Sequence, residues 1–245
     1  MTKELKDIVS NSYRIFKRYK ATIPLDACTA CCLTKNQESE LVTLSVHDIP
    51  FKLLYDYNTA AKTEKPSIEE FKHFLPRLLE LTSELKFLHH SAELVLSQFQ
   101  YYDKSEWTYE ENELIKNFGQ VFFSKCLTIY PIPELESIDS ILIMLWETQI
   151  DIKSLLTEWT SIQTKESVLH FNDLVIRGFR SDRQNELVSS FGDQNLSNVL
   201  IGWIGKETTK HSFAEKIEKI ILEPPADIEQ MTLDELSWTY EKVRI

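Results

Sequence analysis

Residues 3–19 read KELKDIVSNSYRIFKRY, and this stretch decides the fold class. Its apolar side chains recur at steps of three and four residues, and its charged side chains fall mostly opposite. That spacing gathers the apolar residues into one stripe along a helix of four to five turns. The stripe consists of Leu5, Ile8, Val9, Ser12, Ile15, Phe16 and Tyr19.

The same helical spacing returns along the rest of the chain, for example in residues 114–126 and 213–221. Capping boxes, in which a Ser or Thr is followed three residues later by Glu or Gln, indicate where helices begin. They read Thr34…Gln37, Ser67…Glu70, Thr108…Glu111, Ser212…Glu215 and Thr232…Glu235. Strand-type alternation and Asn-Gly or Asp-Gly hairpin signals are hard to find. We therefore predict an all-α fold, either a multi-helix bundle or an irregular HEAT-like helical stack.

Prolines mark most of the expected helix ends, and Pro76 predicts either a kink or a break between two short helices. The predicted helices cover residues 3–19, 35–45, 51–62, 67–82, 84–100, 108–128, 138–147, 151–161, 165–178, 185–191, 195–205, 211–222 and 232–242. The proline-containing stretch 129–137 and the polar stretch 179–197 are candidate linkers. We expect an N-terminal helical region, 1–130, and a C-terminal one, 131–245, unless the two form one continuous domain.

Glycine is scarce, which excludes several function classes. The chain has 5 glycines, and the first of them is Gly119. Phosphate-binding loops need glycine where the backbone approaches the ligand, and neither the Walker A pattern nor Gly-x-Gly-x-x-Gly is present. A P-loop or Rossmann enzyme is therefore not expected. Nucleophile-elbow, zincin and EF-hand patterns are missing as well, which favours a non-enzymatic role.

Charge and hydropathy bound the partners and the compartment. The formal net charge is −11, which disfavours nucleic acid as a ligand and suits a basic protein partner. No apolar run approaches the roughly 18 residues that span a bilayer, and no secretory signal precedes the first helix, so no membrane association is expected. Adjacent Cys31 and Cys32 do not suit a disulfide framework. We expect a cytoplasmic protein with reduced thiols.

Two sets of residues are candidate sites. Cys28, Cys31 and Cys32 lie close together between two helices, and Cys28-x-x-Cys31 has the spacing of half a zinc site. Zinc or iron is therefore the candidate cofactor, with the remaining ligand supplied by the fold. The alternative is that these cysteines are small apolar groups packed at a helix junction.

The second set is a polar cluster on the predicted helices 67–82 and 84–100. If those helices pack antiparallel, their His, Arg and Glu side chains converge on an acid–base or anion-binding site between them. The alternative is that these side chains are solvated charges and one buried histidine. The cluster consists of His73, Arg77, Glu80, His89, His90 and Glu93.

Four segments, read together, resemble a group of uncharacterised bacterial proteins that share a P-L-x-x-C-T-x-C-C segment and an H-F-L-P-R segment. Here these motifs are residues 24–32 and 73–77, and residues 57–61 and 89–93 extend the likeness. The resemblance covers roughly residues 13–130. It implies a bacterial cytosolic protein and brings no activity or residue roles with it.

The sequence favours a helical protein-interaction module whose acidic surface binds a basic partner, in the manner of an immunity protein or antitoxin. The alternative is a metal-binding protein or enzyme that uses the cysteine cluster. A third hypothesis is an α-helical enzyme built on His73, Arg77 and His89 or His90.

Overall fold

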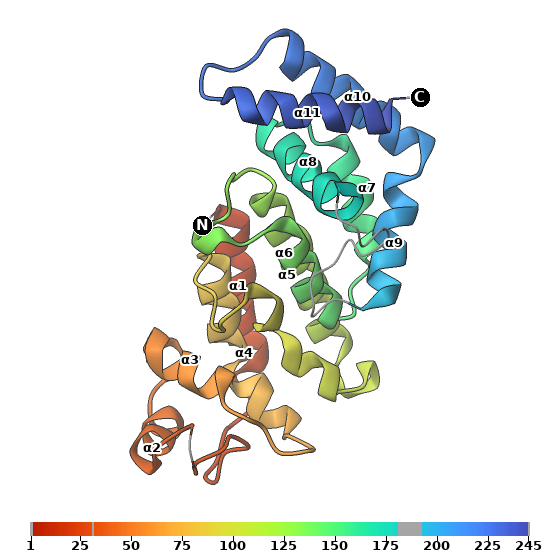
Figure 1. Cartoon of the computed structure of the whole chain (residues 1–245). Helices are drawn as coiled ribbons and strands as arrows, with labels where there is room; N and C mark the ends of the chain where they lie inside the picture. The colour runs from red at the N-terminus through yellow and green to blue at the C-terminus, as the bar shows by residue number, and fades with distance from the viewer. Residues whose placement is uncertain (1, 31, 181–192, 245) are drawn as a thin grey trace. The chain divides into compact units, whose positions relative to one another are not determined.

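A computed structural model describes residues 2–30, 32–180 and 193–244, and confirms the all-α, multi-helix fold (Figure 1). The α-helices are α1 Lys3–Phe16, α2 Lys35–Thr43, α3 Phe51–Thr59, α4 Ile68–Ser83, α5 Tyr109–Cys126, α6 Ile138–Glu147, α7 Ile152–Ser161, α8 Lys165–Arg180, α9 Gln194–Ile204, α10 Glu207–Leu222 and α11 Gln230–Val243. Short 3-10 helices are η1 Val46–Asp48, η2 Ala92–Leu94, η3 Ser97–Tyr101, η4 Lys104–Glu106 and η5 Pro133–Leu135. The described part of the chain contains no β-strand, only an isolated bridge between Ala27 and Lys62.

Side-chain caps explain several helix starts. Thr34 and Gln37 form the expected reciprocal capping box on α2. Thr108 and Glu111 do so on α5, with the Thr108 N–H 2.9 Å from a Glu111 oxygen. Each box satisfies two backbone donors that a helix start leaves unpaired. The Ser67 hydroxyl caps α4, but the carboxylate expected to complete that box is used elsewhere.

Two predicted capping boxes are wrong. Helix α10 begins at Glu207 and α11 at Gln230, so Ser212 and Thr232 lie inside their helices. The Ser212 hydroxyl instead donates to the Thr160 carbonyl, 2.9 Å away. The box pattern is short enough to occur by chance within a helix.

Helix α4 runs through Pro76 without a break. Its apolar residues are buried on nearly all sides, so packing compensates for the backbone hydrogen bond that proline removes. The predicted helix 84–100 is wrong. Leu85 adopts φ 61° directly after α4, and the following segment forms bends and the short helices η2 and η3. A chain that turns this often cannot maintain one helical stripe.

The chain folds into two compact units. Unit 1 comprises Met1–Phe122 and Glu147–Ile150, and unit 2 comprises Phe123–Trp146 and Asp151–Ile245. In unit 1, α4 is the central element and packs against α1 and η1. The predicted helix 185–191 lies outside the described residues. None of the described helices is long and apolar enough to cross a membrane.

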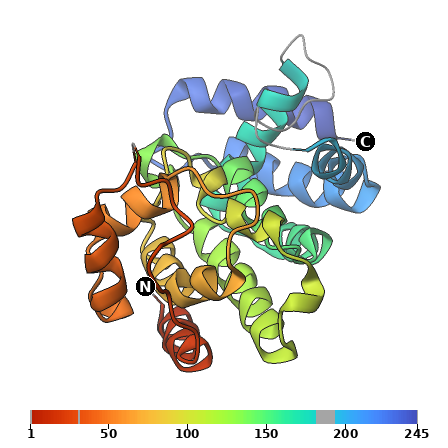
Figure 2. The same ribbon diagram turned by 90° about the horizontal axis from the view of Figure 1, so that it is seen from below.

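Unit 2 is built around an aromatic cluster. The rings of Phe171 and Phe213 stack 3.7 Å apart between centroids, and those of Trp159 and Trp203 lie 5.0 Å apart. Stacked aromatic pairs add about 0.5–1.5 kcal/mol beyond the area they bury. Helices α10 and α11 pack side by side as a hairpin at the C-terminal end of the chain (Figures 1 and 2).

Candidate functional site

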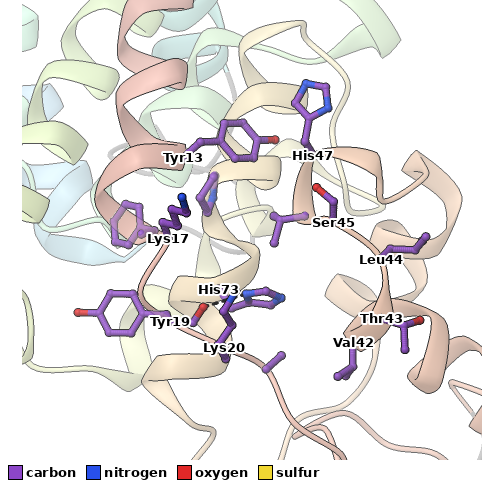
Figure 3. Close-up of a pocket in the computed structure, with 14 residues that line it drawn as sticks. Tyr13, Lys17, Tyr19, Lys20, Val42, Thr43, Leu44, Ser45, His47 and His73 are labelled. Atoms are coloured by element: carbon purple, nitrogen blue, oxygen red, sulfur yellow. Dashed lines mark hydrogen bonds between the residues drawn. The ribbon is translucent and has the colours of Figure 1, made fainter.

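Unit 1 contains a pocket of about 430 Å³ on one side of α4. One wall is the end of α1 and the residues after it, and the other is the segment from α2 to η1, with α4 between them (Figure 3). We call it the α1–α4 pocket. Its lining is Tyr13, Phe16, Lys17, Tyr19, Lys20, Ala21, Val42, Thr43, Leu44, Ser45, Val46, His47, His73 and Pro76.

His73 is the buried polar side chain of this pocket. Its side chain projects from α4, and the residue is only 8% exposed. Nδ1 lies 3.2 Å from the Tyr19 carbonyl oxygen, the contact drawn as a dashed line in Figure 3. A carbonyl oxygen only accepts, so Nδ1 carries the proton. Burial, with the Lys20 charge as a smaller cause, lowers the pKa of His73, so the ring is neutral near pH 7.

It follows that Nε2 of His73 presents a lone pair. This atom is buried and has no hydrogen-bond partner among the described residues. A buried polar atom left unpaired costs about 1–3 kcal/mol, so a donor placed against it is stabilising. The imidazole can accept a hydrogen bond from a ligand hydroxyl or amine, or take a proton from it.

The charged side chains that line the pocket are basic. Lys17 and Lys20, both exposed, stand on the α1 side, and the imidazole of His47 stands on the opposite side. None of the described residues that line the pocket is an aspartate or glutamate. In a chain with a net charge of −11, this is a local cationic patch that attracts anions.

An ordered polar group closes one edge of the pocket. The Tyr13 hydroxyl donates to Oε2 of Glu80 at 2.6 Å, and Arg77 pairs with the same oxygen at 2.5 Å. Arg77 also donates from Nε to the Ile49 carbonyl. The His47 Nε2 lies 3.6 Å from Oε1 of Glu80. Glu80 is therefore neutralised in place, and it holds α1, α4 and η1 together at this edge.

The structure places the predicted polar cluster in two parts. His73, Arg77 and Glu80 lie along α4, where Arg77 and Glu80 form an ion pair and His73 faces the pocket. His89 and His90 lie on the bends after α4 with their ring centroids 4.2 Å apart, and Glu93 is buried in η2. Burial, assisted by His90, lowers the pKa of His89 to about 4. Because no helix 84–100 forms, the packing on which convergence depended is not present.

The segment that carries the cysteines, residues 24–32, is held in place by hydrogen bonds to carboxylates. Glu38 accepts from the Leu25 N–H at 2.8 Å, and Glu70 accepts from the Asp26 N–H at 3.0 Å and from the Tyr57 hydroxyl at 2.8 Å. Lys62 donates to the Tyr57 carbonyl at 2.7 Å. Burial lowers the pKa of Lys62 to about 7. These bonds fix the loop from two sides.

Metal binding by this segment stays a prediction. Cys28 and Cys32 are half-buried, and Cys31 lies outside the described residues. Within the described ranges, no three His, Cys, Asp or Glu side chains are grouped so that they could hold a metal ion. Cys126 is buried in α5, where burial raises the pKa of its thiol to about 12.

A buried ion pair, which the sequence did not reveal, supports the wall of the pocket. Lys72 Nζ lies 2.9 Å from Oε2 of Glu111, and both side chains are almost completely buried. Glu111 also accepts from the Tyr19 hydroxyl at 2.7 Å and from Arg18 at 2.6 Å. The network fixes Tyr19, whose carbonyl sets the tautomer of His73.

The sequence pattern singles out His73 but not Lys17 or Lys20. Lys17 and Lys20 follow directly on the first amphipathic helix, where basic residues usually complement the helix dipole, so their spacing gave no separate signal.

Comparison with models of known protein families, with curated proteins and with solved structures finds no match for the chain.

Proposed function

We propose that unit 1 binds a small anionic molecule that also carries a hydrogen-bond donor, and that it does so in the α1–α4 pocket. The observation that carries this proposal is the buried, unpartnered Nε2 of His73 in a pocket whose charged residues are all basic. A binding site of this size suits a metabolite-sized ligand, since such pockets typically enclose about 300–1,000 Å³.

Each part of the ligand has a counterpart in the pocket. The ammonium groups of Lys17 and Lys20 attract a phosphate or carboxylate at the open side. Because Nδ1 of His73 is committed to Tyr19, Nε2 accepts and does not donate. A hydroxyl or amine on the ligand therefore satisfies it, whereas an anion without a donor, such as sulfate, does not.

The test compares three probes by calorimetric titration of the whole protein. Glycerol 3-phosphate has both the charge and a donor, sulfate has only the charge, and glycerol has only donors. We expect glycerol 3-phosphate to bind more tightly than either of the other two. We also expect it alone to shift the imidazole nitrogen resonance of His73 Nε2 in the NMR spectrum.

Matched variants locate the site. Lys17→Gln/Lys20→Gln removes two charges from the pocket, and Lys3→Gln/Lys116→Gln removes two exposed charges elsewhere in unit 1. We expect the first pair to weaken glycerol 3-phosphate binding by about tenfold, equivalent to about 1.4 kcal/mol. The control pair should leave affinity nearly unchanged. Failure of glycerol 3-phosphate to bind, or an equal loss in both pairs, contradicts the proposal.

A second proposal rests on net charge and concerns the surface. With a net charge of −11 and exposed carboxylates such as Glu64 and Glu69, the chain suits association with a basic protein. Affinity capture from cell extract at low and at high salt tests it. A partner retained only at low salt supports the proposal, and the lack of any salt-sensitive partner counts against it.

A further inference from the structure

A second pocket, in unit 2, has a lining quite different from that of the α1–α4 pocket. It has a volume of about 360 Å³ and lies between α7, α9 and Lys206, one of the two residues that join α9 to α10. We call it the Gly202 pocket. It is lined by Lys153, Leu156, Asn198, Val199, Gly202, Trp203 and Lys206.

The local backbone of Gly202 does not require glycine. It lies inside α9, and among the described glycines none has a positive φ. A Cβ built on Gly202 meets no atom within 4 Å, whereas one on Gly205 lies 3.2 Å from the Ile201 carbonyl oxygen. Glycine inside a helix costs about 1 kcal/mol relative to alanine. At Gly202 glycine is not needed to avoid a steric clash. Its lack of a side chain leaves the floor of the pocket open.

The rest of the floor is apolar. Leu156 and Trp203 are almost completely buried, and Trp203 is held in place by a 3.0 Å hydrogen bond from its indole N–H to the Thr160 hydroxyl. Its ring also stacks on Trp159. A ligand body that rests here contacts apolar side chains and removes its own apolar surface from water.

The rim is basic. Lys153 and Lys206 are both exposed, and no carboxylate is among the described residues that line the pocket. Asp151, close to Lys153 in sequence, is occupied in capping α7, where it accepts from the Lys153 N–H at 3.1 Å. Lys206 occupies the N-cap of α10, which has no side-chain cap, so the positive end of that helix lies at the same place. Glu207 is the one acidic residue in the first turn of α10 and does not line the pocket.

From this combination we propose that the Gly202 pocket binds a carboxylate carried on a short acyl or aryl body. The apolar body lies across Gly202 and against Leu156 and Trp203, and the carboxylate lies between Lys153 and Lys206. This site is independent of the function proposed for unit 1.

Calorimetric titration of the whole protein with octanoate and with 2-naphthoate tests the proposal and separates acyl from aryl bodies. 1-Octanol and octylamine keep the apolar body of octanoate but remove or reverse its charge. We expect at least one carboxylate to bind, and to bind at least about tenfold more tightly than 1-octanol and octylamine. Binding of neither carboxylate overturns the proposal, as does equal binding of 1-octanol.

Substitutions at Gly202 provide the sharpest control, because a side chain there has room to extend. Gly202→Leu places a branched side chain over the floor of the pocket, and Gly202→Ala makes the same backbone change while occupying little of it. Both should fold, and both should raise the melting temperature or leave it unchanged. We expect Gly202→Leu to weaken carboxylate binding by at least about tenfold and Gly202→Ala by less than about threefold. A Gly202→Leu protein that is folded and binds normally contradicts the placement.

The charge on the rim is tested in the same way. Lys153→Gln/Lys206→Gln should weaken carboxylate binding by about tenfold, whereas the control pair Lys210→Gln/Lys219→Gln, on α10 and outside the pocket, should not. If the two pairs behave alike, the carboxylate does not lie between Lys153 and Lys206, and the proposal fails.

Discussion

Replacing Lys72 by methionine tests the energetic role of the buried ion pair in unit 1. Lys72 is bonded to Glu111 at 2.9 Å and to the Glu106 carbonyl at 2.7 Å, and its ammonium lies 4.6 Å from the Trp107 ring centroid. Methionine retains the packing of the lysine stem but leaves the Glu111 carboxylate buried with one partner fewer. Breaking a buried pair in this way costs about 3–5 kcal/mol.

We expect a loss near the lower end of that range, about 3 kcal/mol, because three other donors still bond to Glu111. They are the Tyr19 hydroxyl, Arg18 and the Thr108 N–H. The assay is urea unfolding followed by far-ultraviolet circular dichroism. The exposed Lys116→Met, on α5 of the same unit, is the control and should change stability by less than about 0.5 kcal/mol.

The pH dependence of the free energy of unfolding gives an independent measure of the Lys72–Glu111 interaction. Burial alone raises the pKa of Glu111, but the hydrogen bonds from Thr108, Tyr19, Lys72 and Arg18 outweigh it and lower the pKa from 4.5 to about 2. A carboxyl group whose pKa is lowered by folding stabilises the fold at pH values above its pKa in the unfolded chain, here by about 3 kcal/mol. That stability is lost as the pH falls from about 4.5 to 2. In Lys72→Met, less stability should be lost on acidification. A Lys72→Met cost below about 1 kcal/mol, with an unchanged acid profile, refutes the reasoning.

Three further outcomes follow from buried polar groups. The Cys126 thiol, buried and with its pKa raised to about 12, should resist iodoacetamide in the native protein and react after unfolding, as read by mass spectrometry. Burial lowers the pKa of Lys216 to about 8, so between pH 8 and 10 only the unfolded chain keeps the proton on this residue. The wild type should therefore gain stability over that range relative to Lys216→Met. Equal pH profiles of the two proteins in urea melts argue against this. Asn58→Ala should cost about 2–3 kcal/mol in the same melts, since Asn58 donates to two buried carbonyls and accepts from Gln98 at 2.8 Å; a loss within 0.5 kcal/mol is the contrary result.

Helical periodicity predicted most of the fold because most of the helices bury one stripe. The exceptions have local causes. The pattern in 84–100 retains apolar residues at helical steps, yet Leu85 adopts a left-handed backbone and the segment is bonded to α3, where Asn58 donates to the Leu88 and Val95 carbonyls. Those bonds are between distant parts of the chain, and no local sequence rule contains them.

The site was harder to predict than the helices. His73 stands out in the sequence, but its tautomer depends on the Tyr19 carbonyl, 54 positions away. The network that fixes Tyr19 joins α4 to the start of α5 through Lys72 and Glu111. In the sequence, Glu111 reads only as part of a capping box. Its second role arises from packing, which periodicity does not specify.

The route of the chain through its two units has a practical consequence for fragment design. The chain passes from unit 1 to unit 2 within α5, returns for Glu147–Ile150, and leaves again. The short return is anchored where the Gln149 amide donates to the Tyr102 carbonyl at 3.3 Å. A single cut anywhere in the polypeptide therefore cannot release either half intact. A fragment that ends at residue 130 would include the first residues of unit 2 and would lack Glu147–Ile150 of unit 1. Ligand studies on isolated units therefore require a redesigned connection.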